Sequence, residues 1–326
     1  MKKIFIAMMA MAAMAACATE DTIVTPQGAA IAFGNPFVEN SVRATDNTYG
    51  GGENKIEEVY VWGTVKGKHA AENEAAVYIF DGAEVNDDNN PGEEKAWNCS
   101  VVQYWVPNAK YAFTAVVDGE LSGENKDQIA YTVADQADVL LATAVATTDN
   151  NAAVESGSTV TAAGIVKFNF AHLLSKAVFE FYTTKAFKTD DYTYLIEDIQ
   201  FDNAYTSGTY SVTNSAWTAT ETSSLPFGAD VTVEPSTTEA VTATSEFVRV
   251  FIPAASMNVS FKMSILFNGT SISEKTYNLT ATPDQGFKAG YSYKIKAEIT
   301  ENKPIQFTLD ASTELGWANG GEITVQ

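Results

Sequence analysis

Short apolar runs with a two-residue alternation are the feature that most constrains how this chain can fold. From residue 29 onward, runs of four to ten residues rich in Val, Ile, Tyr, Phe and Thr alternate with clusters of Gly, Asn, Asp and Pro. Side chains two residues apart lie on the same face of a strand, and no long helical periodicity competes with this pattern. The sequence therefore predicts an all-β protein.

The predicted strands fall into two sets. They are residues 55–65, 96–107, 111–118 and 129–134 in the first set, and 164–170, 177–184, 194–205, 246–253, 258–269 and 291–300 in the second. Between the sets, residues 146–164 are polar, small and rich in turn formers, which favours a crossover between domains. Many short strands at these spacings predict two antiparallel β-sandwiches in series, covering residues 44–160 and 161–326.

The amino terminus has the pattern of a secretory signal. Met1-Lys2-Lys3 is a short positive region, and residues 4–16 form an apolar run that is too short to span a bilayer as a mature helix. Small residues come directly before Cys17, as at the cleavage site of a bacterial lipoprotein. We therefore predict a signal peptide over residues 1–16 and a lipid on Cys17. An ordinary signal with a chance cysteine is the alternative.

Charge excludes one class of function. The chain carries 20 basic and 41 acidic residues, which gives a net charge of −21, while 45% of its residues are hydrophobic. The apolar fraction suffices for folded domains. The negative charge would repel phosphate backbones, and no run of basic residues offers a local exception. Nucleic-acid binding is therefore excluded.

Residues that could carry catalysis or bind a metal are scarce. The chain has two cysteines, Cys17 and Cys99, and two distant histidines, and it lacks the common nucleophile, phosphate-loop and zinc motifs. We predict that Cys99 is a core thiol and that His172 is a structural hydrogen-bonding residue. Residues 84–94 contain many oxygen-bearing side chains that could bind calcium. They lack EF-hand spacing, so a solvated hairpin loop is the favoured interpretation. We expect no enzyme activity, metal or cofactor apart from the lipid on Cys17. The sequence does not exclude a glycosidase that uses two distant carboxylates, because such a pair is defined only by the separation of the two groups in space.

Residues 305–317 form the most regular alternating stretch of the sequence. One face carries Ile305, Phe307, Leu309, Ala311, Thr313, Leu315 and Trp317. Extended at about 3.4 Å per residue, this segment would be about 40 Å long, which exceeds the usual strand of a small sheet. A strand of this length could serve a second partner, or it could simply complete its own domain.

A similar alternating face near the amino terminus consists of Ala29, Ile31, Phe33 and Phe37. The polar, glycine-rich residues 38–55 follow it and predict a flexible loop. This loop contains Arg43, whereas the only other arginine, Arg249, lies in an apolar strand candidate. An arginine-specific protease would thus meet one accessible bond, Arg43–Ala44. Taken alone, Arg43 could equally be an ordinary solvated charge.

Cleavage after Arg43 would release residues 17–43, a lipidated pro-segment that includes the first strand. If that strand leaves, the first sandwich keeps an open groove with unpaired backbone groups and empty side-chain pockets. Only another extended, alternating strand can fill such a groove, and residues 305–317 of a neighbouring copy have the required pattern. Because donor and groove lie at opposite ends of one chain, the contact does not close on itself and produces a filament.

Four segments resemble, in their order, the fimbrillin family of fimbrial subunits and surface lipoproteins of Bacteroides-like bacteria. They are residues 56–63, 137–145, 166–181 and 290–299, and the most specific is 168–181, FNFAHLLSKAVFEF. The resemblance implies two transthyretin-like β-sandwich domains, export as a lipoprotein, maturation after an arginine, polymerisation by strand exchange and no enzyme activity. It also allows basal anchors that keep their lipid and tip subunits that bind surfaces.

The sequence therefore predicts a fimbrial subunit at the outer membrane and in the fimbrium. It would be a lipoprotein through Cys17, cleaved at Arg43–Ala44, with residues 305–317 as donor strand. Its partners would be further subunits, an arginine-specific protease and a host or bacterial surface ligand. The alternative is a surface lipoprotein or tip adhesin that does not polymerise and binds glycan or protein through its loops.

Overall fold

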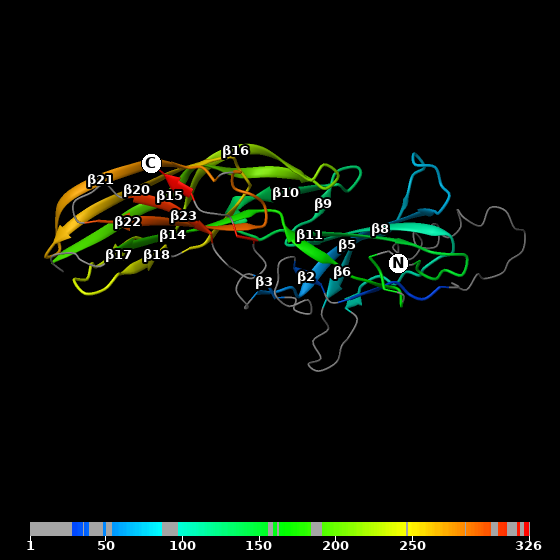
Figure 1. Cartoon of the computed structure of the whole chain (residues 1–326). Helices are drawn as coiled ribbons and strands as arrows, with labels where there is room; N and C mark the ends of the chain where they lie inside the picture. The colour runs from blue at the N-terminus through cyan, green and yellow to red at the C-terminus, as the bar shows by residue number, and fades with distance from the viewer. Residues whose placement is uncertain are drawn as a thin grey trace, which may run out of the picture. The chain divides into compact units, whose positions relative to one another are not determined.

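β-Strands are the main regular structure of the residues that the structure describes (Figure 1). The computed structural model describes residues 28–34, 36–38, 48–49, 54–86, 97–155, 159–161, 163–183, 191–245, 247–283, 285–300, 306–311, 318–319 and 323–325. Within these residues the only helical element is a 3₁₀ turn, η1, at Val133–Asp135. The all-β prediction is confirmed.

The chain divides into two compact units. One unit comprises Met1–Leu121 and Leu140–Ala171, and the other comprises Ser122–Val139 and His172–Gln326. The expected boundary at residue 160 differs from this division in two places. Residues 122–139 belong to the second unit because their strand pairs there, and residues 161–171 stay with the first unit for the same reason.

The first unit is built on a seven-stranded sheet. In spatial order its strands are β2 (Phe37–Val38), β13 (Asn169–His172), β11 (Leu140–Thr147), β8 (Ala109–Val117), β5 (Glu58–Gly67), β6 (Val77–Asn86) and β7 (Asn98–Cys99). The pairs β11–β8, β8–β5, β5–β6 and β6–β7 are antiparallel, whereas β2 runs parallel to β13. A separate small hairpin joins β3 (Thr48–Tyr49) to β4 (Asn54–Lys55).

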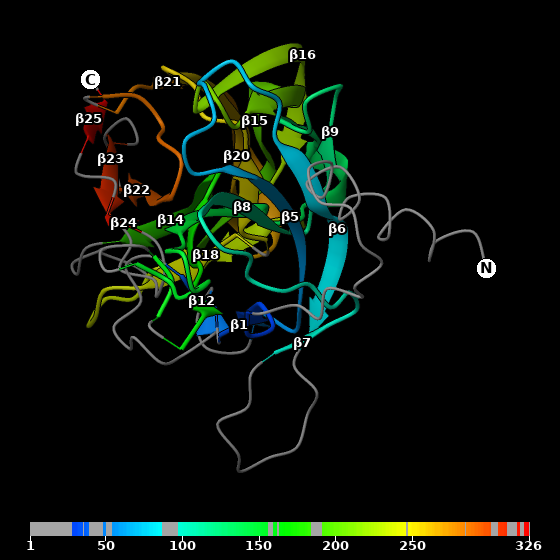
Figure 2. The same cartoon turned by 90° about the vertical axis from the view of Figure 1, so that its right-hand side faces the viewer.

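One face of this sheet is covered by a second, smaller layer. β1 (Ala32–Phe33) and β12 (Ile165–Val166) pair in parallel within this layer and lie side by side (Figure 2). Strand β8 alternates buried and exposed residues, so Tyr111 and Phe113 point into the space between the layers. This space is the hydrophobic core of the first unit.

The second unit has two larger sheets. The first contains β21 (Thr270–Ala281), β20 (Met257–Phe267), β15 (Tyr192–Ser211), β10 (Gln128–Thr132) and β9 (Leu121–Ser122), and β16 (Ala216–Pro226) and β17 (Val231–Val233) also pair with β15. The second contains β18 (Thr242–Thr244), β14 (Ser175–Thr183), β22 (Tyr291–Ile299), β23 (Gln306–Ala311) and β25 (Ile323–Val325), with β19 (Arg249–Phe251) on β14 and β24 (Ala318–Asn319) on β22.

Phenylalanine side chains join the two sheets of the second unit into a sandwich. Phe179 of β14 lies 5.9 Å from the ring of Phe201 of β15, measured between ring centroids. Phe181 of the same strand lies 5.5 Å from Phe261 of β20. All four side chains are fully buried, so the inner faces of the two sheets meet in one core.

Two predictions about the first unit are wrong. Residues 96–107 do not form one strand: β7 pairs with β6 only at Asn98 and Cys99, whereas Trp97 bridges to Phe33 of β1 and Tyr104 bridges to Ala30. A segment that changes partner in this way cannot keep one ladder. Residues 146–164 are not a crossover between units, because they turn back within the first unit, where Val160 bridges to Val166.

Candidate functional site

The candidate site is the groove that holds the first strand of the chain. β1 lies between β12 and the segment 97–105 and forms backbone contacts with both. On the β12 side, the amides of Ala32 and Gly34 donate hydrogen bonds to the carbonyls of Gly164 and Val166, at 3.5 and 2.8 Å. The strand is therefore paired along this edge, in parallel orientation.

The other edge of the strand is paired in the antiparallel sense. Three backbone bonds join it to the segment 97–105: Ile31 N–H to Gln103 O at 2.8 Å, Trp97 N–H to Phe33 O at 3.0 Å, and Trp105 N–H to Ala29 O at 3.0 Å. A strand that is bonded on both edges is an interior strand. Its removal would leave these backbone groups without their partners.

Two side chains of the first strand fill pockets in the core. Ile31 is 5% exposed and Phe33 is 1% exposed. The ring of Phe33 lies 5.5 Å from Phe80 and 5.8 Å from Phe168, between centroids. The expected inward face is therefore present at Ile31 and Phe33, but Ala29 is exposed and does not belong to it.

The floor of the groove is built around Trp105. Its ring is 1% exposed, packs edge-on against Tyr111 at 4.6 Å, and donates from Nε1 to the Gly164 carbonyl at 3.2 Å. Gly164 has a φ of +78°, and a Cβ there would lie 2.6 Å from Trp105 Nε1. At Gly28 a Cβ would lie 1.9 Å from the Trp105 carbonyl oxygen, so only glycine fits at either position.

The first strand continues into the large sheet. Pro36 is buried, and β2 then pairs in parallel with Asn169 and Phe170 of β13. One continuous stretch, residues 29–38, thus contributes to both layers of the first unit. The side chain of Phe37, the fourth residue of the predicted face, lies outside the described residues.

The groove is electrically neutral in a strongly acidic protein. No charged residue occurs in the stretches 28–37, 97–106 or 159–166, which form the strand and its two neighbours. Exposed Val101, Val102 and Tyr104 lie beside the strand on the segment 97–105. Contacts here depend on apolar burial and backbone hydrogen bonds, because no charge pairs are available within these stretches.

The predicted processing residues Cys17, Arg43 and Ala44 lie outside the described residues. Arg249, the second arginine, is half-buried in β19; its Nε donates to the Pro226 carbonyl at 2.7 Å, and its guanidinium lies 4.4 Å from the centroid of Phe247.

The predicted donor segment lies in the sheet of its own unit. β23 pairs antiparallel with β22 over six residue pairs, from Ala311 opposite Tyr293 to Gln306 opposite Glu298. β25 in turn pairs with β23. The backbones of Phe307 and Leu309 belong to β23, while Ile305, Leu315 and Trp317 lie outside the described residues. The structure does not bring this segment to the groove of its own chain.

His172 lies in the second unit, at the end of β13. Its side chain is 1% exposed, and Nδ1 lies 2.9 and 3.0 Å from the two carboxylate oxygens of Asp138. These two residues are 34 positions apart, and no sequence motif links them. Cys99 is half-buried against the core of the first unit, and burial raises the pKa of its thiol.

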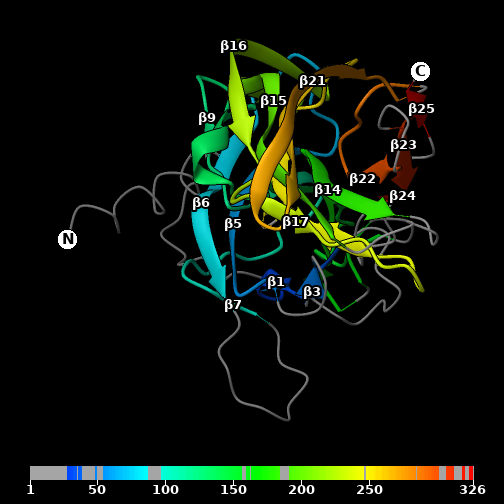
Figure 3. The ribbon, with the colours of Figure 1, turned by 90° about the vertical axis from the view of Figure 1, so that its left-hand side faces the viewer.

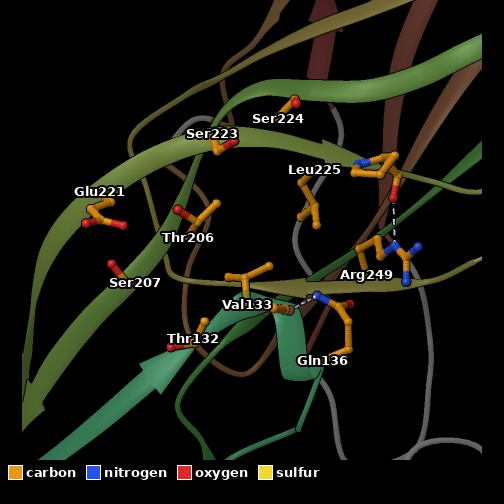
Figure 4. A pocket seen from close by; sticks show the side chains of 12 residues that line it. Thr132, Val133, Gln136, Thr206, Ser207, Glu221, Ser223, Ser224, Leu225 and Arg249 are labelled. Carbon is orange, nitrogen blue, oxygen red and sulfur yellow. Dashed lines mark hydrogen bonds between the residues drawn. The ribbon is translucent and has the colours of Figure 1, made fainter.

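A shallow hollow of about 510 Å³ lies in the second unit beside β16. Hydroxyl groups from Thr132, Thr206 and Ser207 line it, and Glu221 and Arg249 lie at its opposite ends (Figure 4). Its lining contains neither histidine nor cysteine.

The described residues lack both a metal-binding cluster and a membrane-spanning helix. They contain no group of three or more His, Cys, Asp or Glu side chains that could hold a metal ion. They also contain no helix with the length and apolar character needed to cross a bilayer. Residues 87–96, most of the segment with a calcium interpretation, lie outside the described part.

Comparisons with known proteins point in one direction. The model of the fimbrillin-like family matches residues 42–313. A fimbrial protein from Bacteroides vulgatus has a similar structure, with a TM-score of 0.58 and 14% identity over 85% of this chain and 97% of that one. At that identity the likeness shows the fold alone.

Two more distant structures are a fimbrial assembly protein from Parabacteroides distasonis and the fimbrial anchor protein Mfa2 from Porphyromonas gingivalis. The first has a TM-score of 0.42 and 15% identity over 87% of this chain and 95% of that one. The second has a TM-score of 0.36 and 12% identity over 93% of this chain and 100% of that one. No curated protein matches the sequence.

Proposed function

Because the chain belongs to the fimbrillin-like family, we propose that it is a structural subunit of a surface fimbria and polymerises by donor-strand exchange. The family consists of structural proteins rather than enzymes. The observation that carries the proposal is the placement of β1: an interior strand, paired on both edges, that inserts Phe33 into the core and lies close to the amino terminus.

Processing would open the groove. We propose that the chain is exported as a lipoprotein through Cys17, reaches the outer membrane, and is then cut between Arg43 and Ala44 by an arginine-specific protease. β2 ends at Val38 and β3 begins at Thr48, so a cut at this bond separates both β1 and β2 from the rest of the unit. The two neighbours of β1, strand β12 and the segment 97–105, would then present unsatisfied backbone groups to an incoming strand.

The incoming strand must match the groove in direction and pattern. It has to run parallel to β12 and antiparallel to the segment 97–105, with apolar side chains two residues apart for the pockets of Ile31 and Phe33. Residues 305–317 of a neighbouring copy have this alternation. They would have to leave β22, whose six residue pairs with β23 are then replaced by pairing along two edges of the groove.

Charge has little part in this exchange. Residues 1–43 contain as many basic as acidic side chains, so cleavage leaves the net charge at −21. The groove stretches carry no charge at all. We therefore expect filaments that form by apolar burial and persist at high salt.

Peptide binding tests the exchange directly. The chain beginning at Ala44 is mixed with a peptide of residues 305–317, and tryptophan fluorescence is followed because Trp97 and Trp105 flank the groove. The peptide should bind this chain and not the uncleaved chain, whose groove is filled. A matched peptide with Phe307→Asp should not bind, since it places a charge in an apolar pocket. Equal binding of both peptides would contradict the proposal.

In the full protein, Phe307→Asp should abolish multimers while the subunit still folds. The native processing state is read from the intact mass of protein sheared from the cell surface. A chain beginning at Ala44 would support exchange. A chain that keeps acylated Cys17 would support the alternative of a resident lipoprotein or tip adhesin, and a glycan array would then identify its surface ligand.

A further inference from the structure

A subunit of such a filament would carry tension, and the connectivity of the second unit shows which strands would bear it. We infer that β14 and β22 form a load-bearing clamp, a pair of parallel strands that resists extension by shear. The inference depends on the proposed function only for the points at which force is applied. The clamp itself follows from strand order, register and side-chain contacts.

The two strands are joined along their whole length. Eight residue pairs connect them, from Lys176 opposite Ser292 to Thr183 opposite Ile299, and the strands run in the same direction (Figure 3). The chain enters β14 from the first unit, whose last residue is Ala171. It leaves β22 at Ile299 toward the proposed donor segment. Tension therefore pulls the two strands from opposite ends of one ladder.

This arrangement loads the ladder along its axis. At about 3.3 Å per residue, the seven steps from the first pair to the last span about 23 Å, whereas neighbouring strands are about 4.8 Å apart. A force between the start of β14 and the end of β22 is thus nearly parallel to the strands. All eight pairs must yield together, instead of one after another as in peeling.

The start of β14 is braced by another of the three chain connections between the units. The segment 122–139 enters the second unit through β10 and returns to the first unit after Val139. Here the Leu173 amide donates to the Val139 carbonyl at 3.0 Å, and His172 contacts the Asp138 carboxylate. The connections at residues 139/140 and 171/172 therefore contact each other directly before β14. A force transmitted through either of them would act on the first residue pairs between β14 and β22.

Both faces of the ladder are protected. On the inner face, Phe179 and Ile295 are paired and buried in the sandwich core. On the outer face, the Glu180 carboxylate lies 3.1 Å from Lys294 Nζ and 3.7 Å from Lys296 Nζ, so one acidic side chain of β14 bridges to two basic side chains of β22. Buried side chains and an ion-pair cluster keep water from competing for the backbone bonds.

Single-molecule stretching tests the clamp without any polymerisation. The uncleaved chain from Ala18 with Cys99→Ala receives cysteine handles in two geometries. Lys176→Cys with Glu298→Cys loads the ladder in shear, and Tyr182→Cys with Glu298→Cys, two directly opposed positions, peels it. Both geometries release nearly the same length of chain. We expect the rupture force in shear to exceed the peeling force at least about twofold, because the backbone bonds share the load.

A charge variant with a matched control tests the outer face. Glu180→Gln should unfold about two- to fivefold faster in shear at constant force, since it removes the bridge to both lysines. Glu197→Gln is the control; Glu197 forms an equivalent pair with Lys262 at 3.3 Å, but on the other sheet, and should leave the shear rate unchanged. Equal rupture forces in the two geometries would overturn the clamp, whereas failed peptide binding would overturn only the exchange.

Discussion

Replacement of Phe33 by alanine measures how strongly the first strand is held. Phe33 is 1% exposed, and its ring contacts those of Phe80, Phe113 and Phe168 at centroid distances of 5.5, 6.3 and 5.8 Å. Truncating a buried phenylalanine costs about 3–5 kcal/mol, because the transfer free energy is lost and a cavity is left. Phe33→Ala should lower the unfolding free energy of the first unit of the uncleaved chain by this amount.

The assay is urea denaturation followed by tryptophan fluorescence. With a denaturant slope of about 1–3 kcal/mol per molar, the predicted loss moves the midpoint by at least about 1 M. Tyr104→Ala is the matched control, since Tyr104 flanks the same strand but is 43% exposed, and its loss should change the midpoint little. The same Phe33 variant should also admit the donor peptide to the uncleaved chain, because the resident strand is held less tightly.

Two outcomes would refute this reasoning. A loss below about 1 kcal/mol would mean that Phe33 does not anchor the strand, since fully buried aromatic side chains are rarely so tolerant. A large loss without any peptide uptake would mean that the strand is a fixed part of the first unit and is not exchanged.

Three further predictions concern the neighbourhood of the groove. Burial raises the pKa of Tyr111 to about 12, so this side chain ionises first in the unfolded chain. Its contribution to stability should be constant below about pH 10 and should fall between about pH 10 and 12 by at most about 3 kcal/mol. Urea midpoints of Tyr111→Phe should therefore fall less steeply over this range than those of the unchanged protein. Gly164→Ala should destabilise the first unit by about 1–3 kcal/mol in thermal unfolding, because its φ is +78° and the new Cβ would meet the Trp105 ring. Thr148→Val should cost about 1–3 kcal/mol by the same measurement, since the fully buried hydroxyl accepts the Ala109 amide at 3.0 Å.

Local pattern was sufficient for the strands themselves. The alternation in residues 55–65, 111–118 and 291–300 predicts β5, β8 and β22, and each strand is present with the apolar residues on its buried face. The inward positions of Ile31 and Phe33 were predictable in the same way. These features depend only on neighbours along the chain, since successive side chains of a strand point to opposite faces.

Partner choice was not predictable from pattern. Residues 96–107 alternate like one strand, yet they are shared between two partners: Asn98 and Cys99 pair with β6, whereas Trp97 and Tyr104 bridge to Phe33 and Ala30. The alternation also gave no sign that β10 would pair with β15 of the second unit. A two-residue period tells which side chains face inward, but every strand of a β protein has that period, so it cannot choose among partners.

By itself, the sequence determined the all-β class, the inward positions of Ile31 and Phe33, and a net charge of −21. The tertiary structure alone decided that the first strand lies within a groove with Trp105 as its floor, that His172 meets Asp138, and that β14 and β22 are parallel neighbours. The physical reason is that these features join residues far apart in the chain. Their contacts are set by the packing of whole layers, which no local spacing records.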